Sequence, residues 1–379
     1  MSARTSSGPG IATRVFGSQW FVSVLAVLIA FAIGAILIAL SGASVVDAYY
    51  AMFRGSIVDP NAANAVRMIK PLTDSLFYSI PLIISGLGLA LGFRAGLFNI
   101  GGKGQIIVGA LAAVWVGFAV SLPPVVHTLV ALLVAVIAGG LYGGIAGVLK
   151  AKTGANEVIV TIMLNAIATL GLGYTLAQKA WQVPGTNQPV TPKVADSAAF
   201  ARLLPAPFKL HVGFLVALVA LVAFWWLIER STLGFQIRAV GANAAAARTA
   251  GISVERITAI TMVLSGAFLG LAGANEALGT IGYVSRDVAG SIGFDAITVA
   301  LLGRNKTWGT FGAGLLFGAF KAGGYAMQAK GVPIDMILIL QSVIVLLIAA
   351  PALVRWLFRL PDVCALAANT RKGNADEHK

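Results

Sequence analysis

The sequence has very few of the residues that hold metals, form disulfides or move protons. Among 379 residues there is one cysteine, Cys364, and there are three histidines, His127, His211 and His378. A single cysteine excludes an intrachain disulfide and a cysteine metal site. The histidines lie far apart without ligand spacing, and no Ser/His/Asp pattern accompanies them. We therefore expect no catalytic residues, no metal and no cofactor, which argues against an intramembrane enzyme.

Charge is scarce as well. Only 11% of the residues are charged and 58% are hydrophobic, whereas a soluble domain has about 25% charged residues. This composition indicates that lipid surrounds most of the chain. The formal net charge of +13 would suggest nucleic acid in a soluble protein, but in a membrane protein it has to be tested first as a sign of topology.

Long apolar runs predict an all-α polytopic membrane protein with about ten transmembrane helices, some of them short or broken. The first run, from Trp20 to Leu40, would span roughly 30 Å as a helix. It is longer than the apolar region of a signal peptide, so we expect it to be retained. The eighth is short for a crossing and is expected to be broken or half-inserted. The ten runs lie near 20–40, 74–92, 105–122, 125–149, 155–177, 212–228, 257–278, 290–303, 308–326 and 335–354.

The distribution of Lys and Arg orients these spans. An even number of spans places both termini on one side, and the basic residues are concentrated on the segments that a cytoplasmic N-terminus places inside. The charge therefore requires no nucleic acid. The expected layout is a cytoplasmic segment 1–19, a transmembrane domain 20–354 and a cytoplasmic tail 355–379.

Two outer loops are expected to be long, 41–73 and 178–211. The first contains NAANAVRMIKP, a possible short amphipathic helix. The second contains five prolines, which exclude a single helix. Composition leaves two interpretations open for both loops, a simple connector or a docking surface for an external partner.

The stretch GLFNIGGKGQ, residues 96–105, looks at first like a phosphate-binding loop. The phosphate-binding pattern G-x-x-x-x-G-K-[ST] fails at two places, because Leu97 replaces the first glycine and Gly104 follows the lysine. The chain therefore has no recognisable nucleotide site. Two compatible interpretations remain, a glycine-packed turn or a broken helix that lines a pathway.

Residues 229–256 form the longest expected inner loop. Asn243 is a good N-cap, AAAARTA favours helix, and Gly251 suits the left-handed position after a helix. A helix of two turns is too short to be stable alone. The loop is either an ordinary basic connector or a helix that docks on a partner.

Polar residues within apolar runs are costly and are candidates for function. Glu157 begins the fifth run, where a helix N-terminus favours a carboxylate. Asn165 lies eight residues further, near the same face. We expect the translocation pathway to be lined by a set of polar and aromatic residues: Phe98, Asn99, Gln105, Asn165, Asn275 and Glu276.

Four segments resemble the permease subunits of bacterial ABC importers, in the branch that handles ribose, nucleosides and branched-chain amino acids. They are GLFNIGGKGQIIVGALAAV, GANEVIVTIMLNAIA, VGANAAAARTAGISVERITAITMVLSGAFLGLAGANEALG and VALLGRNKTWGTFGAGLLFGA. Lys103 departs from the pattern, since that position is usually acidic, so no carboxylate role carries over to it. The resemblance is strongest to nucleoside and simple-sugar permeases.

The resemblance implies a multi-pass protein of the bacterial inner membrane without its own ATPase site. It implies three partners besides membrane lipids: a double-length ABC ATPase subunit, a second related permease, and an extracytoplasmic binding protein, often a lipoprotein. By analogy, the inner loop carries a coupling helix for the ATPase, with Gly241, Asn243, Ala246, Arg248 and Gly251 as its key residues. Nucleosides are the expected substrate. The alternatives are a ribose-like sugar or a secondary transporter, although the paired midplane carboxylates of the latter are not evident.

Overall fold

The computed structural model describes residues 19–333 together with 338–339, 342–343 and 346–347. The tenth expected span, 335–354, lies mostly outside these residues, as do the segment 1–18 and the tail 355–379. The chain divides into two compact units, one of Met1–Ala51 with Met327–Lys379 and one of Met52–Ala326. In the first unit, α2 (Gln19–Leu40) is followed by α3 (Val45–Ser56), whose last residues belong to the second unit. The Tyr49 hydroxyl donates to the Phe31 carbonyl over 2.5 Å.

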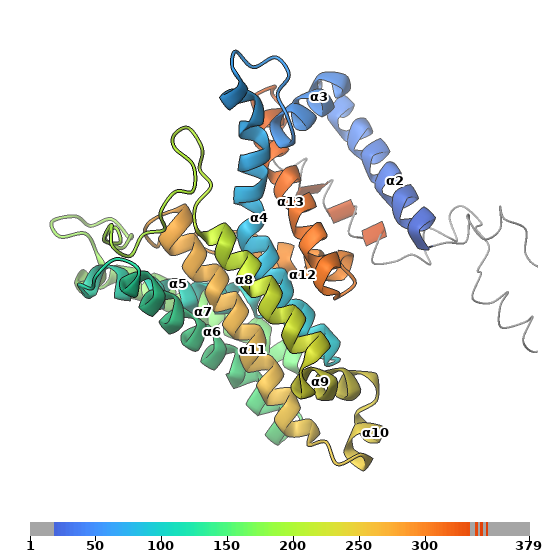
Figure 1. Ribbon diagram of the computed structural model, residues 1–379, viewed down its shortest axis with the longest axis vertical. Helices are drawn as coiled ribbons and strands as arrows, with labels where there is room; N and C mark the ends of the chain where they lie inside the picture. Colours follow the sequence, from blue (N-terminus) through green and yellow to red (C-terminus); the bar gives the residue numbers. More distant parts are fainter. Residues whose placement is uncertain (1–18, 334–337, 340–341, 344–345, 348–379) are drawn as a thin grey trace, which may run out of the picture. The chain divides into compact units, whose positions relative to one another are not determined.

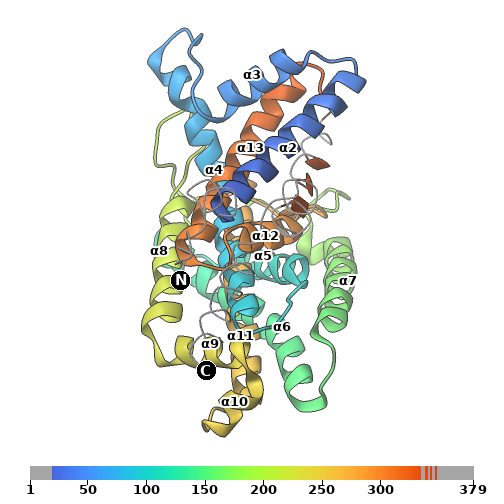
Figure 2. The ribbon, with the colours of Figure 1, turned by 90° about the vertical axis from the view of Figure 1, so that its right-hand side faces the viewer.

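The second unit is a bundle of helices, shown in Figures 1 and 2. Its elements are α4 (Ala65–Arg94), α5 (Gly102–Ala119), α6 (Val126–Thr153), α7 (Glu157–Ala177), η1 (Lys179–Trp181), α8 (Gly213–Trp225), η2 (Trp226–Arg230), α9 (Thr232–Ala242), α10 (Ala244–Thr249), α11 (Val254–Asn275), η3 (Glu276–Thr280), α12 (Ile292–Leu302) and α13 (Thr307–Gln328). Here η1 is a 3₁₀-helix, and η2 and η3 are π-helical continuations of α8 and α11.

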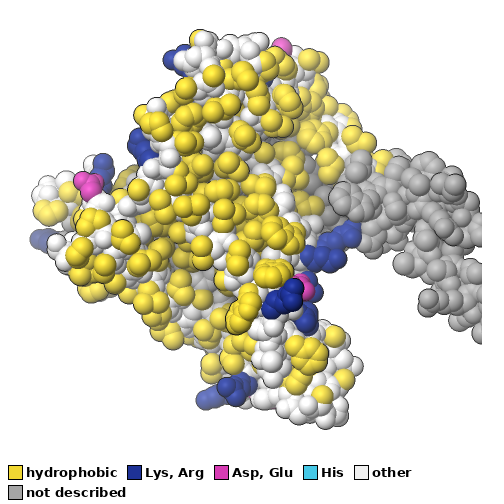
Figure 3. Space-filling view, in the orientation of Figure 1, with side chains coloured by type: hydrophobic (Ala, Val, Ile, Leu, Met, Phe, Trp, Pro, Cys, Tyr) yellow, Lys and Arg dark blue, Asp and Glu magenta, His cyan; other side chains and the backbone are white. Residues whose placement is uncertain are grey.

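Six helices among the described residues are long and apolar enough to cross a membrane. They are α4, α5, α6, α7, α8 with η2, and α11 with η3. Hydrophobic side chains cover most of the face seen in Figure 3, and Lys and Arg lie in a few separate groups. The all-helical, polytopic membrane class predicted from the sequence is thereby confirmed.

The centre of the bundle is packed through glycine. α11 lies against α6, α5 and α4. A Cβ atom at Gly139 of α6 would come within 2.5 Å of the Gly266 carbonyl oxygen and 2.6 Å of the Gly270 Cα of α11. A Cβ at Gly143 would come within 2.7 Å of the Met262 carbonyl oxygen. The backbones therefore touch, which is how membrane helices gain packing energy without a hydrophobic driving force.

The expected outer loop 41–73 differs from the structure. It contains α3, which the sequence analysis did not identify, and the first turns of α4. The expected amphipathic helix is not separate, because Asn64 caps α4 by accepting from the Arg67 N–H over 2.9 Å. Pro71 lies inside the continuous helix that follows. The eighth apolar run forms α12, an apolar helix of 11 residues, which confirms that it is short but not that it crosses the membrane.

Candidate translocation and coupling sites

The chain between α4 and α5, residues 95–101, is not helical, although the two helices that it joins are candidate spans. Backbone groups of a non-helical segment between two membrane helices need hydrogen-bond partners wherever water does not reach them. Three α7 side chains provide such partners, Glu157, Thr161 and Asn165, and we call them the α7 ladder. They are four residues apart and therefore share one helix face.

Each member of the α7 ladder has its own target. The Phe98 N–H donates to Glu157 Oε1 over 3.4 Å, and the Ile100 N–H donates to Thr161 Oγ1 over 3.3 Å. Asn165 bonds twice: its Nδ2 donates to the Ile100 carbonyl over 2.8 Å, and its Oδ1 accepts from the Gly104 N–H over 2.7 Å. The ladder therefore fixes where the chain turns back to begin α5.

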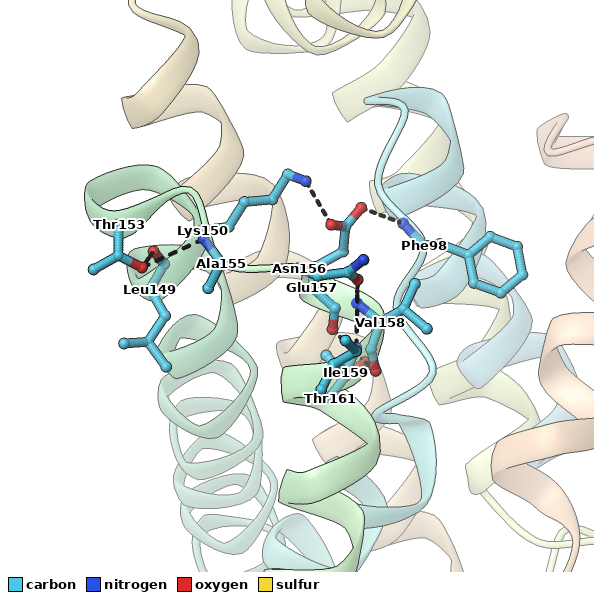
Figure 4. A network of polar contacts seen from close by, with 10 residues as sticks. All are labelled: Phe98, Leu149, Lys150, Thr153, Ala155, Asn156, Glu157, Val158, Ile159 and Thr161. Atoms are coloured by element: carbon cyan, nitrogen blue, oxygen red, sulfur yellow. Dashed lines mark hydrogen bonds and ion pairs between the residues drawn. The ribbon is translucent and has the colours of Figure 1, made fainter.

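The end of the ladder at the start of α7 is charged, as Figure 4 shows. Lys150 Nζ, from the last turn of α6, lies 2.5 Å from Glu157 Oε2. The other carboxylate oxygen faces the Phe98 N–H, while the Phe98 ring points away from it. Asn156 caps α7 by accepting from the Val158 N–H over 2.9 Å. The carboxylate is thus stabilised by a cation and by its place in the first turn of a helix.

Asn99 and Gln105 lie together in the protein interior, each 1% exposed. Asn99 Nδ2 donates to Gln105 Oε1 over 3.0 Å and to Ser265 Oγ of α11 over 2.9 Å. Asn99 Oδ1 accepts from the Gly101 N–H over 2.9 Å and from Gln105 Nε2 over 3.2 Å. We call these three side chains the Asn99 cluster. The cluster connects residues 95–101, which we call the broken segment, to α5 and α11.

The remaining two expected pathway residues lie elsewhere. Asn275 and Glu276 are at the end of α11 and the start of η3, and Asn275 is roughly 15 Å along the helix from Ser265. Both are buried. Among the described residues, neither polar atom of the Asn275 amide makes a hydrogen bond of good geometry, although the amide lies beside the Glu276 carboxyl group. Glu276 accepts from the Thr280 hydroxyl over 3.2 Å and interacts electrostatically with Lys321 of α13. The six expected residues thus form two separate groups.

The expected inner-loop helix is α10. Asn243 Oδ1 accepts from the Ala246 N–H over 3.0 Å, so it is the N-cap. Gly251 has φ +82°, a conformation that favours glycine, and its N–H donates to the Arg248 carbonyl over 3.0 Å. Arg248 pairs with Glu255 across the surface at 2.5 Å. The local signals in the sequence therefore predicted both ends of this short helix correctly.

Arg94 connects residues 229–256 to the candidate spans, and the sequence alone did not reveal this link. A Cβ atom at Gly241 of α9 would lie 2.9 Å from the carbonyl carbon of Arg94 and would overlap its carbonyl oxygen. The Arg94 side chain donates from Nε to the Asn305 carbonyl over 2.8 Å and lies 3.9 Å from Glu229. Arg94 therefore links α9, η2 and the turn between α12 and α13. Its position at the end of a long apolar run was the one available signal.

Residues 190–212, which include most of an expected outer loop and which we call the outer segment, are folded onto the helices. The Thr191 N–H donates to the Val284 carbonyl over 3.0 Å, and the Phe200 N–H donates to the Leu278 carbonyl of η3 over 3.0 Å. His127 bonds the Ser197 hydroxyl over 2.8 Å. His211 is 2% exposed, and burial lowers its pKa to about 4. These contacts make the segment an ordered part of the bundle.

Apolar helices packed through glycine, six of them long enough to cross a membrane, are the features of a multi-pass membrane protein. Residues 72–349 match the family described as "Branched-chain amino acid transport system / permease component". The chain belongs to this family. It is the permease component of an ABC transport system and not the subunit that hydrolyses ATP.

Several characterised relatives are similar over nearly their whole length. The guanosine ABC transporter permease protein NupP of Bacillus subtilis is 40% identical, over 89% of this chain and 95% of that protein. The glucose ABC transporter permease protein TsgB13 of Haloferax volcanii is 35% identical, over 85% of each chain. The nucleoside ABC transporter permease protein NupB of Lactococcus lactis is 32% identical, over 92% of this chain and 95% of that protein. No solved structure matches.

Proposed function

We propose that this permease carries nucleosides into the cell. The observation that carries this proposal is the 40% identity, over 89% of the chain, to a guanosine permease. The similarity to a nucleoside permease from a second organism, over 92% of the chain, supports it. The sequence motif GANEVIVTIMLNAIA contains the α7 ladder, so the resemblance and the best-defined polar structure coincide.

The proposed pathway follows the broken segment and then the outer end of α11. Phe98 is 39% exposed and Asn165 is half-buried, so both can face a passing solute. Asn99 and Gln105 contribute by holding the segment in place, because their amides are bonded within the Asn99 cluster. The proposed outer part of the pathway includes Asn275 and Glu276, two buried polar side chains at the end of α11 and the start of η3.

The proposed energy coupling uses α10. Residues 229–256 and both termini face the cytoplasm, and ten spans in all lie in the bacterial inner membrane. The ATPase, a double-length subunit, receives α10 in a groove. Movement then passes through Gly241 to Arg94, the end of α4, because these backbones are in contact. A second related permease completes the membrane part, and an extracytoplasmic binding protein, often a lipoprotein, delivers the solute.

A sugar is the second candidate substrate. It is favoured by one observation, the 35% identity to a glucose permease over 85% of the chain. Unlabelled nucleosides should compete for transport by a nucleoside permease, and unlabelled sugars should compete for transport by a sugar permease.

Uptake by cells tests the choice between them. Cells that lack this chain, and matched cells that carry it, are given radiolabelled guanosine with excess unlabelled inosine, adenosine, ribose or glucose. We expect uptake that requires the chain and that unlabelled nucleosides abolish. Parallel cultures are given radiolabelled ribose or glucose. If the chain is required for uptake of one of these sugars but no nucleoside is taken up, the proposal is overturned in favour of the sugar.

A further inference from the structure

Lys103 lines a cavity and has no partner in the part of the chain that the structure describes. Its side chain makes no hydrogen bond or ion pair there. It lies in the first turn of α5, half-buried, at the helix end that repels a cation. A lysine at such a place in a membrane protein is costly unless something pairs with it. The cavity beside it is the place for that partner.

The cavity has a volume of about 620 Å³, within the range of small-molecule sites. It is lined by side chains of α5, α7 and α12. Polar groups come from Lys103, Asn165 and Thr169, and an aromatic ring comes from Phe294, which is 55% exposed. Aliphatic side chains such as Ile162 and Leu170 form much of the remaining wall.

The positions of these groups are fixed by the backbone. α12 begins against the start of α5. A Cβ atom at Gly293 would lie 2.5 Å from the backbone nitrogen of Lys103 and 2.8 Å from its Cα. Phe294 follows directly, so its ring is held near the Lys103 side of the cavity. Asn165 is held by its two bonds to the broken segment, to the Ile100 carbonyl and the Gly104 N–H. One amide proton and one lone pair of Asn165 remain free for a ligand.

We infer that this cavity is a site for the base of an oxopurine nucleoside on its way through the permease. The inference rests on the proposed nucleoside transport and names the preferred substrate class. The ammonium group of Lys103 donates to adjacent acceptors, which guanine and hypoxanthine present as O6 and N7. The Phe294 ring stacks on the flat face of the base, as aromatic side chains do in other base-binding proteins.

Other ligands fit this lining less well. Adenine presents an amino group in place of O6, so two donors would face each other. A hexose has hydroxyl groups around its ring, and several of them would lie against the aliphatic wall without partners. The site therefore selects for an acceptor edge on a flat ring.

Photolabelling of the assembled transporter tests this site directly. The complete complex, in the absence of the binding protein, is irradiated with radioactive 8-azidoguanosine, and labelled peptides are identified by mass spectrometry. We expect label in peptides that contain residues 96–105, 162–170 or 292–295. Inosine should compete at least about tenfold better than adenosine, and glucose should not compete.

Two variants separate the contribution of Lys103 to base binding from that of Phe294. Lys103→Met keeps the length of the side chain and removes its donors, and we expect labelling to fall about tenfold and the preference for inosine over adenosine to disappear. Phe294→Leu should weaken the binding of all nucleosides equally, because it removes only the stacking of the ring on the base. Lys193→Met, in the exposed part of the outer segment, is the matched control and should label as the wild type does.

The outcomes separate this inference from the proposed function. If cells show no nucleoside uptake through this chain, the proposed function fails. If uptake of guanosine is intact but wild-type complex takes no label at these peptides, or Lys103→Met labels and discriminates like wild type, the cavity is not the base site. Equal competition by adenosine and inosine in the wild type would also overturn the inference.

Discussion

Asn99 should be one of the most stabilising polar side chains of the second unit. Its amide makes four hydrogen bonds, to Gln105, Ser265 and the Gly101 N–H. Asn99→Leu keeps a similar volume and removes all four. The Gly101 N–H and the Gln105 amide are then left buried without partners, at about 1–3 kcal/mol each. Ser265 can turn its hydroxyl to a carbonyl of its own helix, so we assign it no cost.

The expected loss is therefore about 2–6 kcal/mol. An unfolding entropy of about 2.1 cal/mol/K per residue gives roughly 1–2 °C per kcal/mol for a chain of 379 residues, so the unfolding temperature in detergent should fall by roughly 3 °C or more. Thermal unfolding followed by intrinsic tryptophan fluorescence measures this. Asn187→Leu, at an exposed site in the expected outer loop 178–211, is the control and should unfold within about 1 °C of wild type.

A double variant tests whether Asn99 and Gln105 stabilise the protein as one bonded unit. Once Gln105→Leu is present, Asn99→Leu no longer leaves an orphaned amide at position 105, so its further cost should be smaller than in the wild type. Unfolding of Asn99→Leu at the wild-type temperature, or strictly additive losses, would refute the reasoning that the Asn99 cluster is a single bonded unit.

Three further predictions follow from the inner loop, the topology and the outer segment. Gly241→Ala should leave membrane insertion normal but reduce transport-coupled ATP hydrolysis severalfold, because the added Cβ overlaps the Arg94 carbonyl oxygen; unchanged coupling would contradict the Arg94 link. A cysteine introduced at Asn187 in a chain with Cys364 changed to serine should react with an impermeant thiol reagent from outside, and one at Ala245 should not; the reverse would overturn the proposed orientation. Since burial holds the pKa of His211 at about 4, below the ordinary value of about 6.5, the unfolded chain binds an extra proton between these pH values. Stability should therefore fall by up to about 3 kcal/mol from pH 6.5 to 4, and His211→Asn should lose less over that range in chemical unfolding; an equal loss would count against the burial of a neutral imidazole.

Local signals in the sequence predicted the features that depend on nearby residues. Asn243 is an N-cap and Gly251 is a left-handed residue that ends the helix. Both roles depend only on neighbouring residues, so the sequence predicted the two ends of α10. Apolar length likewise located most of the spans. The helix α3 was missed because Val45–Ser56 mixes apolar and charged residues and lies in what looked like a loop.

Features that depend on distant residues could not be predicted. Nothing in the sequence says that Asn99 bonds to Ser265, which is 166 residues away. The polar side chains of the broken segment were therefore assigned to the pathway as one set, although the structure places Asn99 and Gln105 inside the protein and Asn165 beside the cavity. Lys103 was recognised as a departure from the family pattern, but only the cavity indicates what it can bind.

Reconstitution of the whole transporter is the most direct test of nucleoside transport by this permease. Proteoliposomes that contain this chain, its partner permease and the ATPase, with ATP enclosed on the ATPase side and the binding protein added outside, are given radiolabelled guanosine. The account predicts accumulation of guanosine that requires ATP and that is lost when this chain is omitted. Accumulation of glucose or ribose but not of guanosine or inosine, under the same conditions with the cognate binding protein, would contradict it.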